Sequence, residues 1–467
     1  MSKTIIIIGA GLAGLSAALQ AAENGCNVKL VSSLPSERAQ SVMAEGGINA
    51  ALNTKDENDS PEEHFTDTIK AACGLADPNA VWGMTQAAPE LVHWLLKLGV
   101  KFNMSGYDDV DLRNFGGQKK KRTAFAQSDT GKQIMTAMID AVRRKEASGM
   151  VERFSHHSFL TLRLCGNICC GCVIRDEYSQ ETVELPGDAV IVATGGMHGL
   201  FGNTTGSLSN TGEVTAELFR LGVPLANGEM IQYHPTTVKC GGKRMLISEA
   251  ARGEGGRLFA MEDGKQWYFM EEKYPELGNL MPRDITAREI WKVSHESEVF
   301  LDMTEISDEI ISNKLSGLAD DCMTYLHKDI RKEPVSVLPG IHYFMGGILV
   351  DEQHRTPIQN LYAAGECCAQ YHGANRLGGN SLLGALYGGR VAAKSACEQA
   401  DVVDLSCATQ IDFPPASQIS EIKQLNKVMQ ETMGVVRNEN TLLNGIQTVQ
   451  ALTGNLPLLG MAVLKSA

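Results

Sequence analysis

Residues 4–31 read TIIIIGAGLAGLSAALQAAENGCNVKLV, and this stretch decides the fold of the N-terminal part of the chain. A run of isoleucines predicts a short buried strand over residues 5–8, and an alanine-rich segment predicts a helix over residues 15–24. Gly25 should end this helix, and a second strand is expected over residues 28–31. Strand, glycine turn, helix and strand in this order form the βαβ opening of a dinucleotide-binding domain.

The turn GAGLAG between strand and helix has its three glycines at the spacing of a dinucleotide fingerprint. Gly9 allows the tight turn, Gly11 lets a pyrophosphate approach the backbone, and Gly14 lets helix and strand pack closely. The free N–H groups at the start of the helix would then hold the phosphates. The acid that grips the ribose of NAD is missing, because Ser32 stands at the end of the second strand. This disfavours a plain NAD site and leaves serine hydroxyls as weaker ribose contacts.

Length and composition narrow the class of protein. The 467 residues suggest about two to four domains, and 43% hydrophobic with 21% charged residues excludes a disordered chain. The net charge of −13 argues against nucleic-acid binding. The apolar segment at residues 4–22 is followed too soon by Glu23 for a bilayer span, so no direct membrane span is expected.

Twelve cysteines follow no secretory leader, which favours a reduced, cytoplasmic compartment. The densest group, Cys165, Cys169, Cys170 and Cys172, lies in LCGNICCGCVIR and could be interpreted as a metal site. The run alternates like a strand, however, and no second ligand pair follows at the spacing of a zinc finger or ferredoxin. We therefore expect packed thiols and no metal.

The rest of the chain contains both predicted helices and predicted strands. Helices are expected from the capping box at Ser60 to about residue 73, near 88–98 and near 131–146, and short strands over 151–186. Residues 361–400 return to strand, loop and long helix, and residues 415–450 have helical periodicity. The fold class is α/β with an α+β insert. The expected parts are 1–227 and 346–405 for the dinucleotide-binding domain, 228–345 for an inserted capping domain, and 406–467 for a helical segment.

Nine motifs carry a resemblance that runs from the N-terminus to about residue 450. In this order they resemble the flavoprotein subunits of fumarate reductase and succinate dehydrogenase, and the related L-aspartate oxidases share most of them. The family fold is a Rossmann-like FAD-binding domain with an inserted capping domain and a C-terminal helical segment, which is short here. The motifs are GAGLAG at 9–14, AEGGINAAL at 44–52, FGGQ at 115–118, ATGG at 193–196, QYHPT at 232–236, SEAARGEGG at 248–256, PRD at 282–284, HYFMGGI at 342–348 and GECCAQYHGANRLGGNSLL at 365–383.

The resemblance implies FAD as cofactor. Many family members link FAD covalently through a histidine, and Gln40 occupies the matching position, so non-covalent FAD is expected. A covalent link tends to raise the flavin potential in this family, so its absence favours reduction of fumarate. Glu213 stands where the family has the acid of a Gly-Asp-Gly element. The expected cofactor contacts are Gly9, Gly11, Ala13, Gly14, Ser32, Ser41, Glu45, Gly46, Gly47, Thr194, Gly195, Gly196, Glu213, Glu366, Ser381 and Leu382.

The resemblance also implies a dicarboxylate site. His234, Ser248, His342 and Arg376 are expected to hold the two carboxylates, and nearby cations must overcome the overall charge of −13. Phe115 stands where L-aspartate oxidases carry a glutamate that would meet the substrate amino group. An aromatic residue there suits fumarate better than aspartate.

For catalysis, the resemblance implies that Arg283 is the proton donor and that Glu249 and Arg252 form its relay. Their spacing places Glu249 and Arg252 one turn apart if the segment is helical. The alternative interpretation of Arg283 is a surface pair with Asp284.

The chain has no iron–sulfur or c-type haem motif, so electrons must come from a separate carrier. An iron–sulfur or other electron-donating subunit, a reduced flavin carrier and a nicotinamide all remain open, and such a partner could associate the chain with a membrane in anaerobic respiration. Residues 119–121 are three lysines in what should be a solvated loop, and they could dock an acidic carrier; Arg122 matches a basic position of the family. The expected function is fumarate reduction. The alternatives are another unsaturated acid, L-aspartate oxidation, or an FAD-binding redox subunit without turnover.

Overall fold

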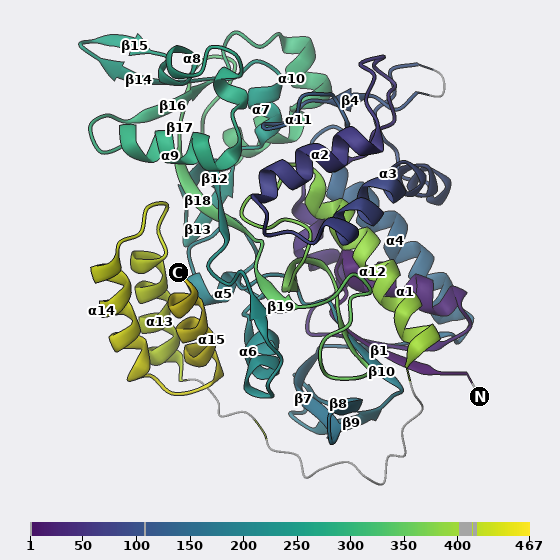
Figure 1. Ribbon diagram of the computed structural model, residues 1–467. Helices are drawn as coiled ribbons and strands as arrows, with labels where there is room; N and C mark the ends of the chain where they lie inside the picture. Colours follow the sequence, from purple (N-terminus) through teal and green to yellow (C-terminus); the bar gives the residue numbers. More distant parts are fainter. Residues whose placement is uncertain (1, 107–108, 401–412, 414–417) are drawn as a thin grey trace.

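The computed structural model describes residues 2–106, 109–400, 413 and 418–467. Its centre is a five-stranded parallel sheet in the order β20-β10-β1-β2-β6 (Figure 1). The predicted strands and helix of the N-terminal βαβ unit are confirmed, with helix α1 (Leu12–Glu23) three residues longer at its start than expected. The strands are β1 (Thr4–Ile8), β2 (Asn27–Ser32), β6 (Val151–Ser155), β10 (Ala189–Val192) and β20 (Leu361–Ala363).

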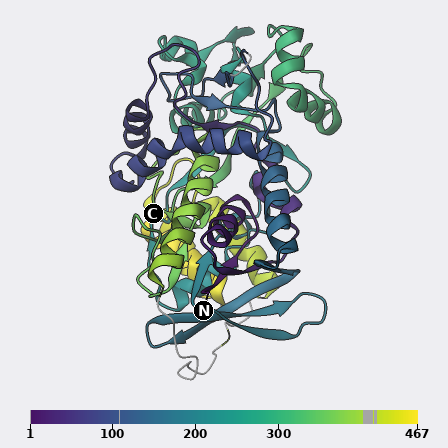
Figure 2. The ribbon, with the colours of Figure 1, turned by 90° about the vertical axis from the view of Figure 1, so that its right-hand side faces the viewer.

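Both faces of this sheet are covered, which explains why β1 is apolar at successive positions. Ile5 and Ile7 pack into a core with the helices, whereas Ile6 and Ile8 pack into a second core with the sheet β7-β8-β9. Figure 2 shows that second sheet crossing beneath the helical layer. The helices are α1, α2 (Pro61–Ala72), α3 (Pro78–Leu98), α4 (Thr130–Ala147) and α12 (Asn380–Gln399), and the strands are β7 (His157–Cys165), β8 (Ile168–Asp176) and β9 (Thr182–Pro186).

Close approach of backbones fixes the turn before α1. A Cβ on Gly14 would lie 1.8 Å from the carbonyl oxygen of Gly9, so any side chain there would force helix and turn apart. Helix α12 packs along α1 in the same way, because a Cβ on Gly389 would lie 2.3 Å from the carbonyl oxygen of Ala13. Chain segments more than 370 residues apart therefore form one layer.

The thiols of the β7–β9 sheet are part of its core. Cys169, Cys170 and Cys172 are free and buried, and burial raises the pKa of the Cys169 thiol to about 12. Cys165 is disulfide-bonded, so the expectation of a packed thiol is wrong at that position. Within the described ranges, no group of three or more His, Cys, Asp or Glu side chains could hold a metal ion.

A separate set of elements lies above the central sheet in Figure 1 and has its own hydrophobic core. The long strands β12 (Ile231–Cys240) and β18 (Leu338–Phe344) pair antiparallel and run from this set towards the central sheet. The other elements are β13 (Lys243–Leu246), β14 (Arg257–Glu262), β15 (Lys265–Trp267), β16 (Val299–Asp302), β17 (Val335–Ser336), α7 (Glu249–Gly253), α8 (Phe269–Lys273), α9 (Arg283–Val293), α10 (Asp308–Lys314) and α11 (Ser316–Asp321).

Three helices close the chain, α13 (Ile419–Thr432), α14 (Glu439–Gln450) and α15 (Asn455–Ser466). They pack with α5 (His198–Phe201) and α6 (Glu213–Arg220) around Leu200 and Leu459. The first two lie within residues 415–450, where the sequence has helical periodicity, and α15 follows them within the expected helical segment 406–467. The remaining short strands are β3 (Ile48–Asn49), β4 (Leu112–Arg113), β5 (Thr123–Ala124), β11 (Leu225–Ala226), β19 (Gly347–Leu349) and β21 (Cys368–Ala369).

The fold class expected from the sequence is confirmed, because helices and a parallel sheet form one part and an α+β insert interrupts it. The proposed domain limits at 227/228 and 345/346 stay predictions, and the limit at 405/406 lies outside the described residues. Helix α3 is longer than expected because it continues through Pro89 from its N-cap at Asp77. Among the described residues, no helix combines the length and the apolar character that a membrane crossing requires.

The basic run at residues 119–122 is not uniformly solvated. Arg122 is fully buried, and its guanidinium group lies 2.8 Å from Asp59 and 3.0 Å from Asp67. The preceding Lys121 remains exposed and lies 3.5 Å from Glu57. Arg122 thus holds together the loop before α2, helix α2 and strand β5.

We predict that Arg122→Met lowers the free energy of unfolding by about 3–5 kcal/mol, because it leaves two buried carboxylates without their cation. Lys121→Met removes an exposed charge next to it and should change this free energy by no more than about 0.5 kcal/mol. Urea denaturation of both variants with FAD bound measures the difference. Equal effects of the two substitutions would contradict the role assigned to Arg122.

Candidate active site

A cavity of about 990 Å³ runs between the glycine turn of β1-α1 and the paired strands β12 and β18. This volume is at the upper end of the range of about 300–1,000 Å³ for small-molecule sites. All of the cofactor contacts expected from the sequence line it except Gly14, whose role is the close packing described above. The lining residues among them are Gly9, Gly11, Ala13, Ser32, Ser41, Glu45, Gly46, Gly47, Thr194, Gly195, Gly196, Glu213, Glu366, Ser381 and Leu382.

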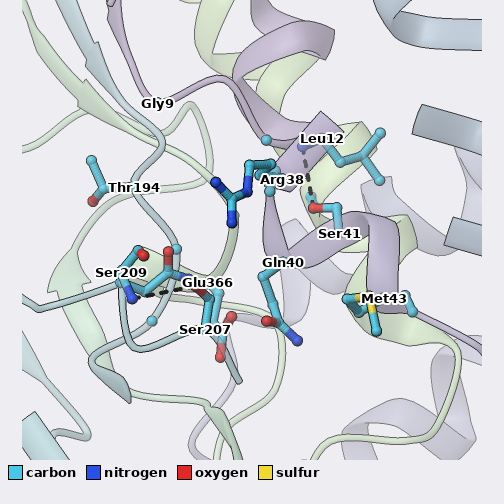
Figure 3. Close-up of a pocket in the computed structure, with 18 of the residues that line it drawn as sticks. Gly9, Leu12, Arg38, Gln40, Ser41, Met43, Thr194, Ser207, Ser209 and Glu366 are labelled. Atoms are coloured by element: carbon cyan, nitrogen blue, oxygen red, sulfur yellow. Dashed lines mark hydrogen bonds between the residues drawn. The ribbon is translucent and has the colours of Figure 1, made fainter. Parts of the chain in front are cut away.

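One end of the cavity is suited to a diphosphate. Helix α1 begins at Leu12, immediately after Gly11, and Leu12 N–H donates to Ser41 Oγ at 3.3 Å (Figure 3). Figure 3 also shows the Arg38 side chain extending between Thr194 and Gln40 in the cavity. Arg38 was not predicted as a cofactor contact, although a cation two residues before Gln40 was a usable signal. A helix N-terminus and an arginine together provide donors for phosphate oxygens.

Two further polar groups line the same end of the cavity. One has no hydrogen-bond partner among the described residues, and the other is held in place by its neighbours. Ser32 Oγ is buried at the end of β2 and has no hydrogen-bond partner among the described residues. Glu366 accepts from Phe344 N–H at 3.1 Å and lies 3.5 Å from His198 Nε2. A free hydroxyl and an oriented carboxylate are the groups that ribose hydroxyls require, so this end fits an adenine dinucleotide such as FAD.

The middle of the cavity contains the start of helix α12. Gly379 is its N-cap with φ of 87°, and a Cβ there would lie 2.2 Å from Asn49 Oδ1, so only glycine fits. Asn49 Nδ2 donates to Asn380 Oδ1 at 2.7 Å and fixes the first residue of the helix. Ser381 follows on the cavity wall, so the positive end of the helix dipole faces the cavity.

Glu45 is an unusual acid in this wall. Its Oε2 is buried and has no hydrogen-bond partner among the described residues. Burial, followed by the charges of Asp321 and Asp129, raises the pKa of Glu45 to about 8, and Arg113 only partly opposes them. The carboxyl group is therefore mostly protonated at pH 7.

The substrate-binding residues expected from the sequence meet at the other end. His234 on β12 and His342 on β18 have ring centroids 5.1 Å apart, and both line the cavity with Arg376. Burial and the charge of Arg283 hold the pKa of both imidazoles well below the usual value, so the rings are neutral at pH 7.

Arg376 is the main cation of this end. Its guanidinium carbon lies 4.2 Å from the centre of the Tyr343 ring, and the structure places no carboxylate within ion-pair distance of it among the described residues. Burial, followed by the charge of Arg283, lowers its pKa to about 9, which leaves it positive at pH 7. Ser248, the N-cap of α7, and Phe115 complete the wall. A buried, unpaired guanidinium beside neutral donors is a site for an anion.

The three expected catalytic residues form one buried network. Arg283 donates to Glu249 Oε2 from Nε at 2.7 Å, and its Nη2 lies 2.6 Å from the same oxygen. Glu249 Oε1 accepts from Gly116 N–H at 2.9 Å and lies 3.5 Å from Arg252 Nη2. Although burial acts to raise it, Arg283 and Arg252 hold the pKa of Glu249 below its ordinary value.

The three residues of this network lie at different depths from the cavity. Arg283 and Glu249 line the cavity, whereas Arg252 lies behind Glu249 and donates to Asn279 O at 2.6 Å. The expected helical turn between Glu249 and Arg252 is confirmed by α7. The alternative pairing of Arg283 with Asp284 is wrong, because Asp284 pairs with Arg288 at 2.9 Å on the exposed side of α9.

Comparisons with known proteins identify relatives of this chain. A family model described as an FAD binding domain matches residues 4–382. The succinate dehydrogenase flavoprotein subunit of Bacillus subtilis is 40% identical over 97% of this chain and 78% of its own length. L-Aspartate oxidase of Streptomyces coelicolor is 32% identical over 97% of this chain and 80% of its own. A mutant of the E. coli quinol fumarate reductase FrdA superposes with a TM-score of 0.88 at 26% identity, covering 100% of this chain and 86% of that one.

The pKa of Glu45 predicts a pH dependence of stability. Its value of about 8 exceeds the ordinary 4.5, so the folded state binds this proton more tightly than the unfolded chain does. The resulting stability is present at acid pH and is lost as the pH rises towards 8. Glu45→Gln cannot ionise, so its free energy of unfolding should exceed that of the wild type increasingly from pH 5 to pH 8.5, by on the order of a few kcal/mol at the upper end.

Thermal denaturation at several pH values, with saturating FAD, measures this difference. Glu23→Gln neutralises an exposed carboxylate at the end of α1 and serves as the matched control, with no comparable trend expected. A constant difference between Glu45→Gln and the wild type over this pH range would show that Glu45 ionises normally.

Proposed function

Because the chain belongs to the FAD-binding family of succinate dehydrogenase and fumarate reductase flavoprotein subunits, we propose that it reduces fumarate to succinate as a catalytic flavoprotein subunit. The chain is an FAD-dependent oxidoreductase of this type. The observation that carries the proposal is the buried Arg376, which lies with two neutral histidines at the same cavity end as Arg283. These groups form an anion site beside a proton-bearing network.

FAD, when bound, supplies the hydride that reduces the carbon–carbon double bond. The glycine turn, Arg38 and Ser41 would hold its phosphates, and Ser32 and Glu366 its ribose hydroxyls. Gln40 lines the cavity at the position where many relatives have the linking histidine, and its amide cannot form that bond, so we propose non-covalent FAD. The same substitution supports fumarate reduction as the favoured direction.

The four-carbon dianion would be held by charge and by fixed donors. Arg376 can grip one carboxylate through two parallel hydrogen bonds, the imidazole of His342 and the hydroxyl of Ser248 supply neutral donors, and His234 would complete the same end of the site. These donors are oriented before the substrate arrives, so they also stabilise charge that develops in the transition state. Phe115 on the wall offers no partner for an ammonium group, which weighs against L-aspartate as the substrate.

Arg283 would give a proton from its guanidinium group to the second alkene carbon. Its Nη1 donates to Gln232 Oε1 at 3.0 Å, so the group is held from two sides. Glu249 lies between Arg283 and Arg252 and can pass a proton from the second guanidinium to the first after each turnover. Burial lowers the pKa of Arg252, which favours release of its proton.

Electrons would reach FAD from a separate protein. The relative from Bacillus subtilis is named a subunit, which supports a partner for this chain as well. We propose an iron–sulfur or other electron-donating subunit, through which a chain in the cytoplasm could associate with a membrane.

The proposed function is tested with reduced viologen dye as electron donor. Fumarate should reoxidise the dye rapidly in the presence of the wild type, and Arg283→Ala should keep FAD and bind fumarate but turn over about 10²–10⁴ times more slowly. Arg288→Ala, on the exposed side of the same helix, is the control and should keep the wild-type rate. Oxygen-linked turnover of L-aspartate instead of fumarate would favour the alternative function of an L-aspartate oxidase. A near-normal rate of fumarate reduction by Arg283→Ala would exclude Arg283 as the proton donor.

Non-covalent binding predicts that acid precipitation releases the flavin. Trichloroacetic acid should leave a colourless pellet and a yellow supernatant, because no bond joins FAD to the chain at Gln40. Yellow colour that stays with the washed pellet would contradict this prediction. The same precipitation of Gln40→His provides a comparison of flavin release, since this variant carries the histidine through which many relatives link FAD.

A further inference from the structure

We propose that Thr205 is a positioning residue that holds His342 in the form protonated on Nε2, so that a neutral imidazole donates a hydrogen bond to a substrate carboxylate. This inference rests on the proposed function. Thr205 lies on the loop that follows α5, more than 130 residues before His342, and it belongs to none of the motifs that identified the family.

The geometry around Thr205 is specific. Thr205 Oγ1 lies 2.7 Å from His342 Nδ1, and both residues line the cavity. The backbone N–H of Thr205 donates to Ile341 O at 3.0 Å, and Thr204 forms a parallel bridge with Ile341. The loop is therefore fixed to strand β18 directly beside the histidine, so its backbone keeps the Thr205 side chain within reach of His342 Nδ1.

The proton on the imidazole can be assigned from its two neighbours. A carboxylate offers only acceptors, so the ring nitrogen that meets it must carry hydrogen. Because burial and the charges of Arg283 and Arg376 keep the ring neutral, it carries one proton. Nδ1 is taken by Thr205, so Nε2 is the nitrogen that donates, and the Thr205 hydroxyl must donate to Nδ1.

The hydroxyl is free to make this donation. Its other acceptor, Ile341 O, lies 3.4 Å away, which is long for an O–H···O hydrogen bond. The contact of 2.7 Å with Nδ1 is the stronger of the two.

His234 provides an internal contrast. Its Nδ1 lies 3.0 Å from Thr236 O and 3.3 Å from Thr236 N, so it is held mainly by the backbone of its own strand β12. A substitution at Thr205 therefore removes support from His342 and leaves the contacts of His234 in place. Only one of the two histidines depends on a side chain from a distant loop.

The experiment compares Thr205→Val, which keeps the shape but loses the hydroxyl, with Thr205→Ser, which keeps the hydroxyl. Succinate binding is followed by the change in flavin absorbance, and fumarate turnover is measured with reduced viologen. Thr205→Val should weaken succinate binding and raise KM for fumarate about five- to tenfold, the effect of one hydrogen bond, with kcat within about threefold because Arg283 supplies the proton. Thr205→Ser should return both values to within about twofold of the wild type.

A second measurement reads the position of the proton in the wild type itself. Nitrogen-15 NMR of the wild type with labelled histidine and bound succinate reports which ring nitrogen of His342 carries hydrogen, and His342→Gln assigns the signal. Hydrogen on Nε2 and a bare Nδ1 support the proposal, whereas the opposite form overturns it. Equal loss of binding in the valine and serine variants, or no loss in either, also overturns it. A wild type that binds no dicarboxylate at all overturns the proposed function itself, which is a distinct result.

Discussion

A carboxylate between two guanidinium groups is the interaction on which the candidate site depends. Glu249 receives Arg283 on one oxygen and Gly116 N–H and Arg252 on the other, and all three ionised groups are buried. Removing one partner from such a group is costly, because a bare charge is left in a poorly solvated place. The network joins the insert, through α7 and α9, to the segment around Gly116. With Arg376 added, cations outnumber carboxylates here, which supplies a local field opposite to the overall charge of −13.

The parts of the fold that local sequence predicts are those where several signals agree. In residues 4–31, strand propensity, glycine spacing and helix pattern all indicate the same βαβ unit. Helix α15 lies beyond the periodic pattern of residues 415–450, because Pro457 and Gly460 are helix breakers by composition. Pro457 lies in the first turn, however, where proline is tolerated, and Gly460 is needed beside Leu425. The buried pairing of Arg122 was not predicted, because its partners Asp59 and Asp67 lie more than 50 residues away in the chain. Local pattern carries no information on such pairs.

In the candidate site, too, local sequence predicted some features, whereas contacts between distant segments were not predicted. Motifs named residues of both ends of the cavity, and the structure places them in its lining, with Gly14 and Arg252 behind it. Motifs did not give the order in which Arg252 stands behind Glu249, nor the contribution of Arg38 and Thr205. These depend on the path of loops in space, and an arginine or threonine in a polar loop has no distinctive local signal.

The placement of β20 and α12 has a consequence for biosynthesis. Strand β20 borders β10, and α12 covers α1, so the N-terminal βαβ unit reaches its final surroundings only after about residue 399 has left the ribosome. At roughly 5–20 residues per second, the apolar face of α1 waits about 20–80 s for its partner helix. During that interval the nascent chain presents a surface that chaperones bind. The flavin pocket, which includes Ser381 and Leu382, can be completed only after residue 382 of the 467 has been made.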